Sequence, residues 1–237
     1  TDATRYMRFY TPATERHDGK WNTSKYRLSL NAPSVNAVEI LDPYVRLEGI
    51  QIERNAGADA RTVLYVNAAS GNVTIEACII KKSGTAAASS GINNYGQTGY
   101  IINTIVYDCD DGIKGYQIAY IYNCDFISCV YGIHAFADSS VNWIVKNCLA
   151  KGSTTADFSK NAGTGTMTCS NCASGDATAD DFGGSGNSIS QTFTFVDEAG
   201  DDFHLASTDA GAKDFGADLS GDANYPFSDD IDGQTRS

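Results

Sequence analysis

The fold of this chain is decided by six copies of one ten-residue pattern: VRLEGIQIER from Val45, VTIEACIIKK from Val73, YIINTIVYDC from Tyr100, AYIYNCDFIS from Ala119, WIVKNCLAKG from Trp143 and MTCSNCASGD from Met167. Their starts lie 19 to 28 residues apart. A period of this length is typical of a solenoid, in which each unit buries its apolar face only by stacking on its neighbours.

Aligned without gaps, the copies form columns of similar residues. The third and sixth columns are apolar, and their members are Leu47, Ile75, Ile102, Ile121, Val145 and Cys169, then Ile50, Cys78, Ile105, Cys124, Cys148 and Cys172. Apolar residues at alternate positions predict strands with one buried face. The alternation breaks at the fifth column, which reads Gly49, Ala77, Thr104, Asn123, Asn147 and Asn171. Gly and Asn most easily take the left-handed backbone conformation, so this column predicts a tight bend between two strands.

A second short run follows most copies, for example Gly91-Ile92, Gly112-Ile113 and Gly132-Ile133. Each period therefore carries about three short strands and no helix. The Leu-x-x-Leu-x-Leu frame of a leucine-rich repeat is missing. From about residue 24 to 180 the columns resemble the right-handed parallel β-helix of the pectate-lyase-like superfamily, including an Asn ladder at a bend.

This resemblance implies an all-β fold, a single-stranded right-handed parallel β-helix of about six to seven rungs. Within one structural domain we expect three parts. Residues 1–43 form an irregular first rung that caps the N-terminal end, residues 44–180 form the repeats, and residues 181–237 form an acidic closing segment packed on the last rung.

The net charge of -12 belongs to the tail of the chain. Residues 1–174 contain 15 acidic and 15 basic residues, whereas residues 175–237 contain 14 acidic residues against Lys213 and Arg236. A neutral body lacks the basic surface that phosphate backbones require, so we expect no nucleic-acid partner. No apolar run has the length of a membrane span, and the absence of an initiating Met and of an apolar leader predicts a mature or trimmed piece.

Seven cysteines could indicate disulfides or a metal site. Cys78, Cys124, Cys148 and Cys172 share one apolar column and Cys169 lies in another, which predicts a stack of small buried thiols. Cys169 and Cys172 form a C-x-x-C motif without a second pair at zinc spacing. Cys109 and Cys129 lie one rung apart, close enough for a disulfide to be considered.

The second strand set offers an outward face for sugars. One column reads Tyr65, Asn93, Lys114, His134 and Ser159, and two residues further lie Asn67, Tyr95, Tyr116, Phe136 and Asn161. Sugar rings stack on aromatic side chains, while amides and cations bind their hydroxyl groups. We therefore consider a glycan site at Asn93, Tyr95, Lys114, Tyr116, His134 and Phe136. The alternative is an ordinary solvated strand face with stacked aromatic side chains.

Enzyme chemistry has one candidate pair. Asp110-Asp111 before Gly112-Ile113 resembles the aspartate pair of polygalacturonase-like enzymes, which would supply the acid and the base of an inverting hydrolase. The Gly-His-Gly and Arg-Ile-Lys elements of that pattern are missing, as is the set of calcium-binding carboxylates of a lyase. Asp-Asp-Gly is also a common turn. His17 beside Asp18 is a further possible pair, although a histidine in such a turn is more often structural.

The acidic tail contains a candidate cation loop. Asp218, Ser220, Asp222 and Asn224 place oxygen ligands at alternate positions, with Asp229 behind them, which resembles a calcium loop. Ala223 stands where such a loop needs Gly, and Asp229 replaces the bidentate Glu. Any calcium would be structural, and no other cofactor is expected. The motifs Asp202-Phe203-His204-Leu205 and Asp230-Ile231-Asp232-Gly233 resemble the closing segments of secreted bacterial and phage-associated β-helix proteins.

These observations favour a non-enzymatic scaffold, extracellular or on a virion surface, that holds a polysaccharide or cell-surface glycan on one lateral face. One alternative is a polysaccharide-degrading enzyme that uses Asp110 and Asp111. A second alternative is a purely structural assembly subunit, since an exposed strand face can serve as the interface of a homotrimer or a larger particle.

Overall fold

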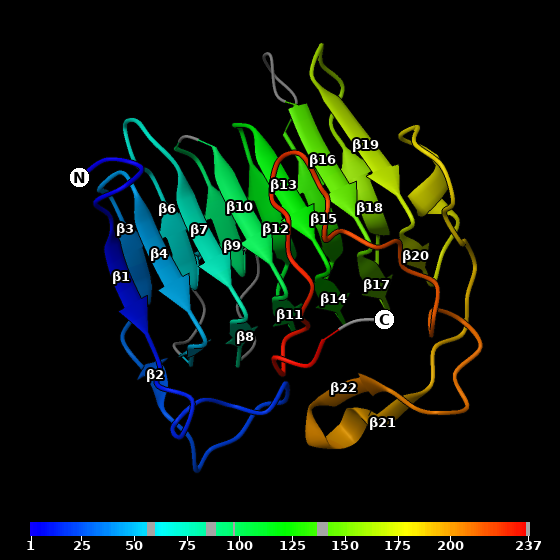
Figure 1. Cartoon of the computed structure of the whole chain (residues 1–237), viewed down its shortest axis with the longest axis horizontal. Coiled ribbons are helices and arrows are strands. Elements are labelled where there is room, and N and C mark those ends of the chain that lie inside the picture. Colours follow the sequence, from blue (N-terminus) through cyan, green and yellow to red (C-terminus); the bar gives the residue numbers. More distant parts are fainter. Residues whose placement is uncertain (56–59, 84–88, 97, 137–141, 236–237) are drawn as a thin grey trace.

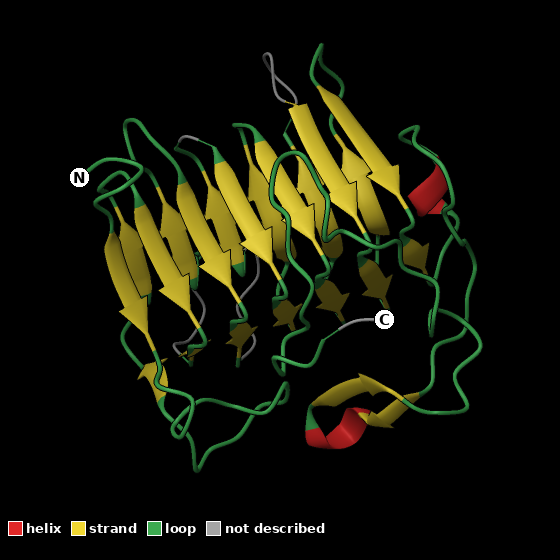
Figure 2. Ribbon diagram, viewed as in Figure 1, coloured by secondary structure: helices red, strands yellow, loops and turns green. Residues whose placement is uncertain are grey.

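The computed structural model describes residues 1–55, 60–83, 89–96, 98–136 and 142–235 of the chain. These residues form a parallel β-solenoid of about six turns, as the repeat predicts. Its strands stack along the long axis of the molecule, with the first rung at one end and the last rung at the other (Figure 1). Helix is confined to two 3-10 turns, η1 (Thr178–Asp180) and η2 (Glu198–Gly200), within the described residues (Figure 2). No helix in this part of the chain has the length and apolar character needed to cross a membrane.

Three parallel sheets form the sides of the solenoid. The first sheet consists of β1 (Met7–Tyr10), β4 (Val45–Glu48), β7 (Val73–Glu76), β10 (Gly99–Ile102), β13 (Ala119–Tyr122), β16 (Asn142–Lys146) and β19 (Thr166–Ser170). The second consists of β2 (Arg27–Leu30), β5 (Gln51–Arg54), β8 (Ile79–Lys82), β11 (Ile105–Tyr107), β14 (Asp125–Ile127), β17 (Leu149–Lys151) and β20 (Ala173–Ser174). The third consists of β3 (Val38–Ile40), β6 (Leu64–Val66), β9 (Ile92–Asn94), β12 (Asp111–Gly115), β15 (Tyr131–Ala135) and β18 (Ala156–Lys160). A separate antiparallel pair, β21 (Phe195–Asp197) and β22 (Asp202–Leu205), lies in the tail.

The bend between the first two sheets is left-handed in every repeat. The residues at this position all have positive φ angles, and they are Gly49 (67°), Ala77 (49°), Asn103 (48°), Asn123 (60°), Asn147 (53°) and Asn171 (51°). The column of Gly and Asn predicts this bend, and the structure confirms it.

The register of the third repeat differs from the sequence alignment by one residue. Gly99, not Tyr100, pairs with Val73 and Ala119, so Asn103 occupies the bend in place of Thr104. A one-residue shift turns each side chain to the opposite face. Ile101 therefore points into the solenoid, whereas Ile102 lies on the outer face and is buried there by the tail. The apolar run in this repeat permits both alignments, which is why the sequence pattern misplaced it.

The core is one continuous cluster of stacked apolar side chains inside the three sheets. Cys78, Cys124, Cys148 and Cys172 lie within it, fully buried as predicted, and all seven cysteines are free thiols. Burial raises the pKa of the Cys78 thiol to about 12, so this thiol stays protonated at neutral pH.

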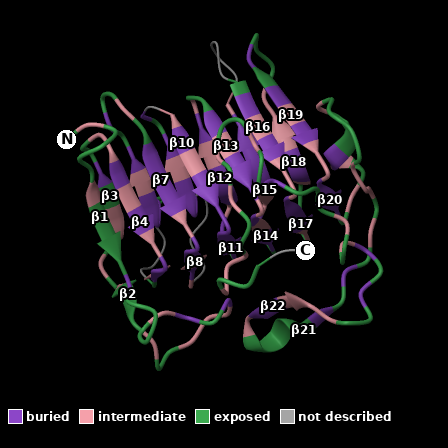
Figure 3. Cartoon of the chain, in the orientation of Figure 1, coloured by how far each residue is buried: buried purple, intermediate pink, exposed green. Residues whose placement is uncertain are grey.

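The first rung is more regular than the sequence suggested. Residues 1–43 supply one strand to each sheet, so they extend the solenoid in register. Phe9 pairs with Leu47 and Leu28 pairs with Ile52, so both point toward the core axis. Phe9 is nevertheless 56% exposed and Leu28 37% exposed, because no described rung lies beneath them. In Figure 3 the first strands are largely exposed where the following ones are buried.

Only part of the C-terminal segment lies over the last rung. Backbone amides of Cys169, Asn171 and Ser174 donate to carbonyls of Gly183, Ser185 and Ser188, and Phe182 and Ile189 pack against the core. The remaining tail runs back along the solenoid (Figure 1). Phe193, Phe195 and Phe203 cover the second sheet, and Leu219, Tyr225 and Phe227 cover part of the first.

Acidic side chains of the tail form ion pairs with lysines on the body of the solenoid. Among the described residues, four ion pairs join the two parts: Lys20–Asp202 (3.2 Å), Lys81–Asp201 (3.1 Å), Lys146–Asp222 (2.5 Å) and Lys151–Glu198 (2.6 Å). Each pair places a carboxylate of the tail against a partly buried lysine of the body, and such a pair near the surface contributes up to about 1 kcal/mol.

Candidate functional site

The lateral face of the third sheet carries the two predicted columns in register. Tyr65 pairs with Asn93, Asn93 with Lys114, Lys114 with His134, and His134 with Ser159. Immediately after the ends of β9, β12 and β15 lie Tyr95, Tyr116 and Phe136, which follow one another along the face. The six candidate glycan-binding residues therefore come together on one side of the solenoid, which we call the lateral face, with His134 buried beneath its surface.

Aromatic rings run along the lateral face from rung to rung. The ring centroids of Tyr95 and Tyr116 lie 5.1 Å apart with their planes at 70°, and those of Tyr116 and Phe136 lie 5.0 Å apart with their planes at 36°. Tyr65 extends this row beyond Tyr95 at 6.5 Å. Tyr95 is the most open member, with 51% of its surface exposed. Such a row offers apolar ring surface over several rungs of the solenoid.

Beside the rings lies a polar cluster around Asp111. The Nδ1 of His134 lies 2.7 Å from Asp111 Oδ1, and the Nζ of Lys114 lies 3.2 Å from Asp111 Oδ2. The buried hydroxyl of Ser90 donates to the same carboxylate at 3.3 Å. The Nε2 of His134 lies 3.0 Å from Asn161 Oδ1. Both ring nitrogens of His134 thus have partners within the chain.

The electrostatics of this cluster keep Asp111 ionised. Burial alone raises the pKa of Asp111, but the hydrogen bond with His134 and the charge of Lys114 outweigh burial, so the pKa is lowered. The imidazole of His134 is sandwiched between aromatic rings, with centroids 4.2 Å from Tyr131 and 4.4 Å from Phe136. The lateral face therefore combines ordered rings with a fixed, internally paired set of charges.

The two aspartates of the hydrolase pattern have separate surroundings. Asp111 is buried in the polar cluster, whereas Asp110 accepts a hydrogen bond from the backbone amide of Ser89 at 2.5 Å. Asp110 lines an open hollow of about 510 Å³ at the corner between the second and third sheets, together with Cys109, Cys129, Lys82 and Asp108. Cys109 and Cys129 are buried free thiols there, and burial raises the pKa of the Cys129 thiol to about 12.

The proposed calcium ligands have other partners. Asp218 accepts hydrogen bonds from the amide and the hydroxyl of Ser220, and Asp222 forms its ion pair with Lys146. The side-chain amide of Asn224 donates to the Tyr122 hydroxyl at 3.4 Å. Within the described residues, no three His, Cys, Asp or Glu side chains are grouped so that they could hold a metal ion. This geometry adds no support to the predicted calcium loop.

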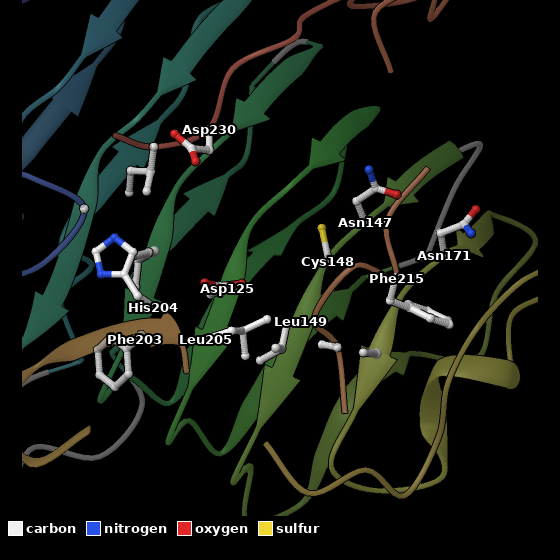
Figure 4. A pocket seen from close by; sticks show the side chains of 16 residues that line it. Asp125, Asn147, Cys148, Leu149, Asn171, Phe203, His204, Leu205, Phe215 and Asp230 are labelled. Carbon is white, nitrogen blue, oxygen red and sulfur yellow. The ribbon is translucent and has the colours of Figure 1, made fainter. Parts of the chain in front are cut away.

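A second hollow, of about 200 Å³, lies between the Asn ladder and the tail (Figure 4). His204 lines it, with Nδ1 2.5 Å from Asp202 Oδ1 and Nε2 2.9 Å from Asp232 Oδ2. The hydrogen bond with Asp232 is the main reason that the pKa of His204 is raised to about 9. Because the imidazole contacts both carboxylates, it joins the tail motif that contains Asp202 to the motif that contains Asp232. Both motifs are visible in the sequence, but no local pattern there pairs them.

His17 is also structural. It is buried, its Nε2 donates to the carbonyl of Ala77 at 2.9 Å, and its Nδ1 accepts from the amide of Gly19 at 3.2 Å. Burial lowers the pKa of His17 to about 4, so the ring is neutral at physiological pH. Asp18 is not among its hydrogen-bond partners in the described chain.

Comparison of the chain with protein-family models, with curated proteins and with solved structures finds no match. The fold class is therefore defined by the architecture itself, a parallel β-solenoid with an aromatic lateral face.

Proposed function

We propose that this protein is a non-enzymatic scaffold that binds a glycan along its lateral face, in an extracellular setting or on a virion surface. The observation that carries the proposal is the row formed by Tyr95, Tyr116 and Phe136, with ring centroids 5.1 and 5.0 Å apart, beside polar side chains. An extended saccharide laid along the solenoid axis would meet a new ring at each rung.

The polar cluster supports binding over catalysis. Asp111 is engaged by His134, Lys114 and Ser90, and both nitrogens of His134 are occupied. A general acid or base must reach the proton that it transfers, and these groups reach one another instead. In this proposal the buried His134 and Asp111 hold Lys114 and the neighbouring rings in place, so that ligand hydroxyl groups meet a pre-ordered surface.

The test is retention and product formation on a panel of acidic and neutral polysaccharides. We expect retention without new reducing ends or unsaturated products. Tyr116→Ala should weaken binding about fivefold, since one stacked ring contributes on the order of 1 kcal/mol. Tyr26→Ala, which removes an exposed tyrosine at the N-terminal end, is the matched control and should leave binding unchanged.

Two results would overturn the proposal. New products that disappear in Asp111→Asn would assign a polysaccharide-degrading activity to the Asp110–Asp111 rung. The absence of both retention and products across the panel would remove the glycan hypothesis and favour a purely structural assembly role.

A further inference from the structure

Both lysines on the described strands of the third sheet already have partners within the chain. Lys114, in β12, forms its ion pair with Asp111 at 3.2 Å. Lys160, in β18, donates to the backbone carbonyls of Asn161 and Gly163 at 3.4 and 3.5 Å. A ligand carboxylate or sulfate would have to draw one of these lysines away from its partner, and the loss of Lys114 would leave the buried Asp111 with one partner fewer.

Carboxylates outnumber cations along this sheet. The described strands carry Glu39, Asp111 and Asp157 against the two lysines. The described residues within three positions of these strands add one arginine and three aspartates, which are Arg61, Asp42, Asp108 and Asp110. The chain as a whole has a net charge of -12. Both the local and the total charge therefore repel a polyanion that approaches the lateral face.

The carboxylates of the strands are also engaged. Glu39 accepts a hydrogen bond from the side-chain amide of Asn36 at 2.7 Å. Asp157 accepts from the backbone amide of Gly175 at 2.8 Å. Asp111 is buried and contacts His134 as well as Lys114. A positively charged sugar would therefore also have to displace an existing contact before it could pair with these groups.

Neutral groups make up the accessible part of the lateral face. Four rings from successive rungs are exposed or half-buried, and neutral polar side chains lie beside them: Tyr65, Tyr95, Tyr116 and Phe136, then Asn67, Asn93 and Ser159. The apolar faces of sugar rings pack on aromatic side chains, and sugar hydroxyl groups exchange hydrogen bonds with amides and hydroxyls. Neither contact requires a charge on the ligand.

We propose that the ligand of the lateral face is a neutral polysaccharide, a chain of uncharged sugars, and not a polyuronate, a sulfated glycan or an amino-sugar polymer. This inference rests on the proposed function, since it names the class of glycan that the same face binds. Affinity then comes from ring packing and from hydrogen bonds between neutral groups. Salt screens contacts between charges, so binding of this kind should depend little on ionic strength.

Binding of the full chain to immobilised polymers tests the class of ligand. The neutral probes are β-glucan, galactomannan and xylan, the polyanions are polygalacturonate and alginate, and the polycation is chitosan. We expect retention on at least one neutral polymer and on none of the charged ones. The affinity should change less than about twofold between about 0.1 and about 1 M sodium chloride, over which the Debye length falls from about 10 to about 3 Å.

Two variants and a matched control assign the retention to the lateral face. Tyr95→Ala and Tyr116→Ala should each weaken binding to the neutral polymer about fivefold. Tyr95 is 51% exposed, so its removal tests the face with little effect on packing. Tyr26→Ala removes a tyrosine of nearly equal exposure, 52%, from the segment before β2 and should leave binding unchanged.

The outcomes separate this inference from the proposed function. Retention confined to polygalacturonate, alginate or chitosan, and lost at high salt, would overturn the neutral class while glycan binding itself stands. The absence of retention on every polymer would overturn the proposed function together with this inference. Neutral retention that is indifferent to both Tyr95→Ala and Tyr116→Ala would place the site elsewhere and would also overturn both.

Discussion

The two ends of the solenoid differ in how far the apolar core of the terminal rung is shielded from water. At the C-terminal end, residues 176–191 hydrogen-bond to the last strands and seal the core, so that Phe158 in the last rung is 1% exposed. At the N-terminal end, Phe9 in the first rung occupies a similar inward position and is 56% exposed. Two inward phenylalanines thus differ in burial because residues 176–191 cover the last rung, whereas no described residues cover the first.

This difference shows that, in a solenoid, the burial of a side chain depends on the rungs or segments that stack on its own rung. Each repeat supplies the same kind of strand, but the stabilisation of a rung depends on what stacks above and below it. The tail adds a second layer of stabilisation on the sides of the solenoid, where Tyr107 and Phe203 lie 4.9 Å apart between centroids. The first rung receives little of this cover at its outer edge.

The largest effect should come from truncating the two inward phenylalanines. We expect Phe158→Ala to lower the free energy of unfolding by about 3–5 kcal/mol, because it removes a fully buried ring. Phe9→Ala should cost less than about 1 kcal/mol, because its ring is already 56% exposed, and chemical denaturation would measure both losses. Similar losses at both positions would show that the open end is covered in solution by the chain itself.

The next largest loss of stability should come from disturbing the contact between the N-terminal loop and the tail. A Cβ at Gly19, which has φ +74°, would overlap Asp232 Oδ1 and lie 2.5 Å from His204 Nε2. Gly19→Ala should therefore destabilise the protein by about 2–4 kcal/mol in thermal or chemical unfolding.

Gly183→Ala is the control for this backbone effect. Gly183 has nearly the same φ angle, +73°, but no atom would lie within 4 Å of a Cβ there. Its cost should be only the left-handed strain, about 1–2 kcal/mol. Equal costs for the two variants would mean that the loop does not depend on its contact with His204 and Asp232.

A smaller effect should appear as a pH dependence of the tail. The pKa of His204 is raised to about 9 in the folded state, from 6.5, chiefly by Asp232. Its contribution to stability is therefore fully present below about pH 6.5 and is lost as the pH rises through 9. After allowance for its partial exposure, the loss should be about 1–2 kcal/mol.

Denaturation curves between pH 6 and 10 would measure this loss in wild type and in His204→Gln. The variant should lack the decline assigned to His204. Asp202 acts in the opposite direction. Burial raises its pKa, but His204 and Lys20 lower it overall, so its contribution is lost as the pH falls through the acidic range. An identical decline in wild type and variant above pH 7 would contradict the assignment.

The smallest effect should come from an exposed residue in the tail that covers the sides of the solenoid. Val196 lies in the tail, yet it is 60% exposed. Val196→Thr should change the unfolding free energy by no more than about 0.5 kcal/mol. A larger change would show that the cost of a substitution in the tail depends on where the residue lies in the tail and not on how far its side chain is buried.

The sequence alone determined the features that repeat locally. Alternating apolar residues predicted the strands, and Asn123, Asn147 and Asn171 predicted the left-handed bend. The recurring Gly-Ile run aligned Lys114 with His134 on the lateral face. These features depend on side-chain period and backbone preference, which are properties of neighbouring residues. The six candidate glycan residues could be placed on one face for this reason, while their role as a binding site stays a proposal.

Only the tertiary structure decided what depends on residues distant in the chain. It fixed the register of Gly99, the partners of Asp111, and the pairing of His204 with Asp232. It also showed that the acidic tail turns back to meet lysines such as Lys146, and that Phe9 is exposed among the described residues despite its inward position. Side-chain period cannot predict such contacts, because a stacking pattern states which face is buried but not which distant segment covers it.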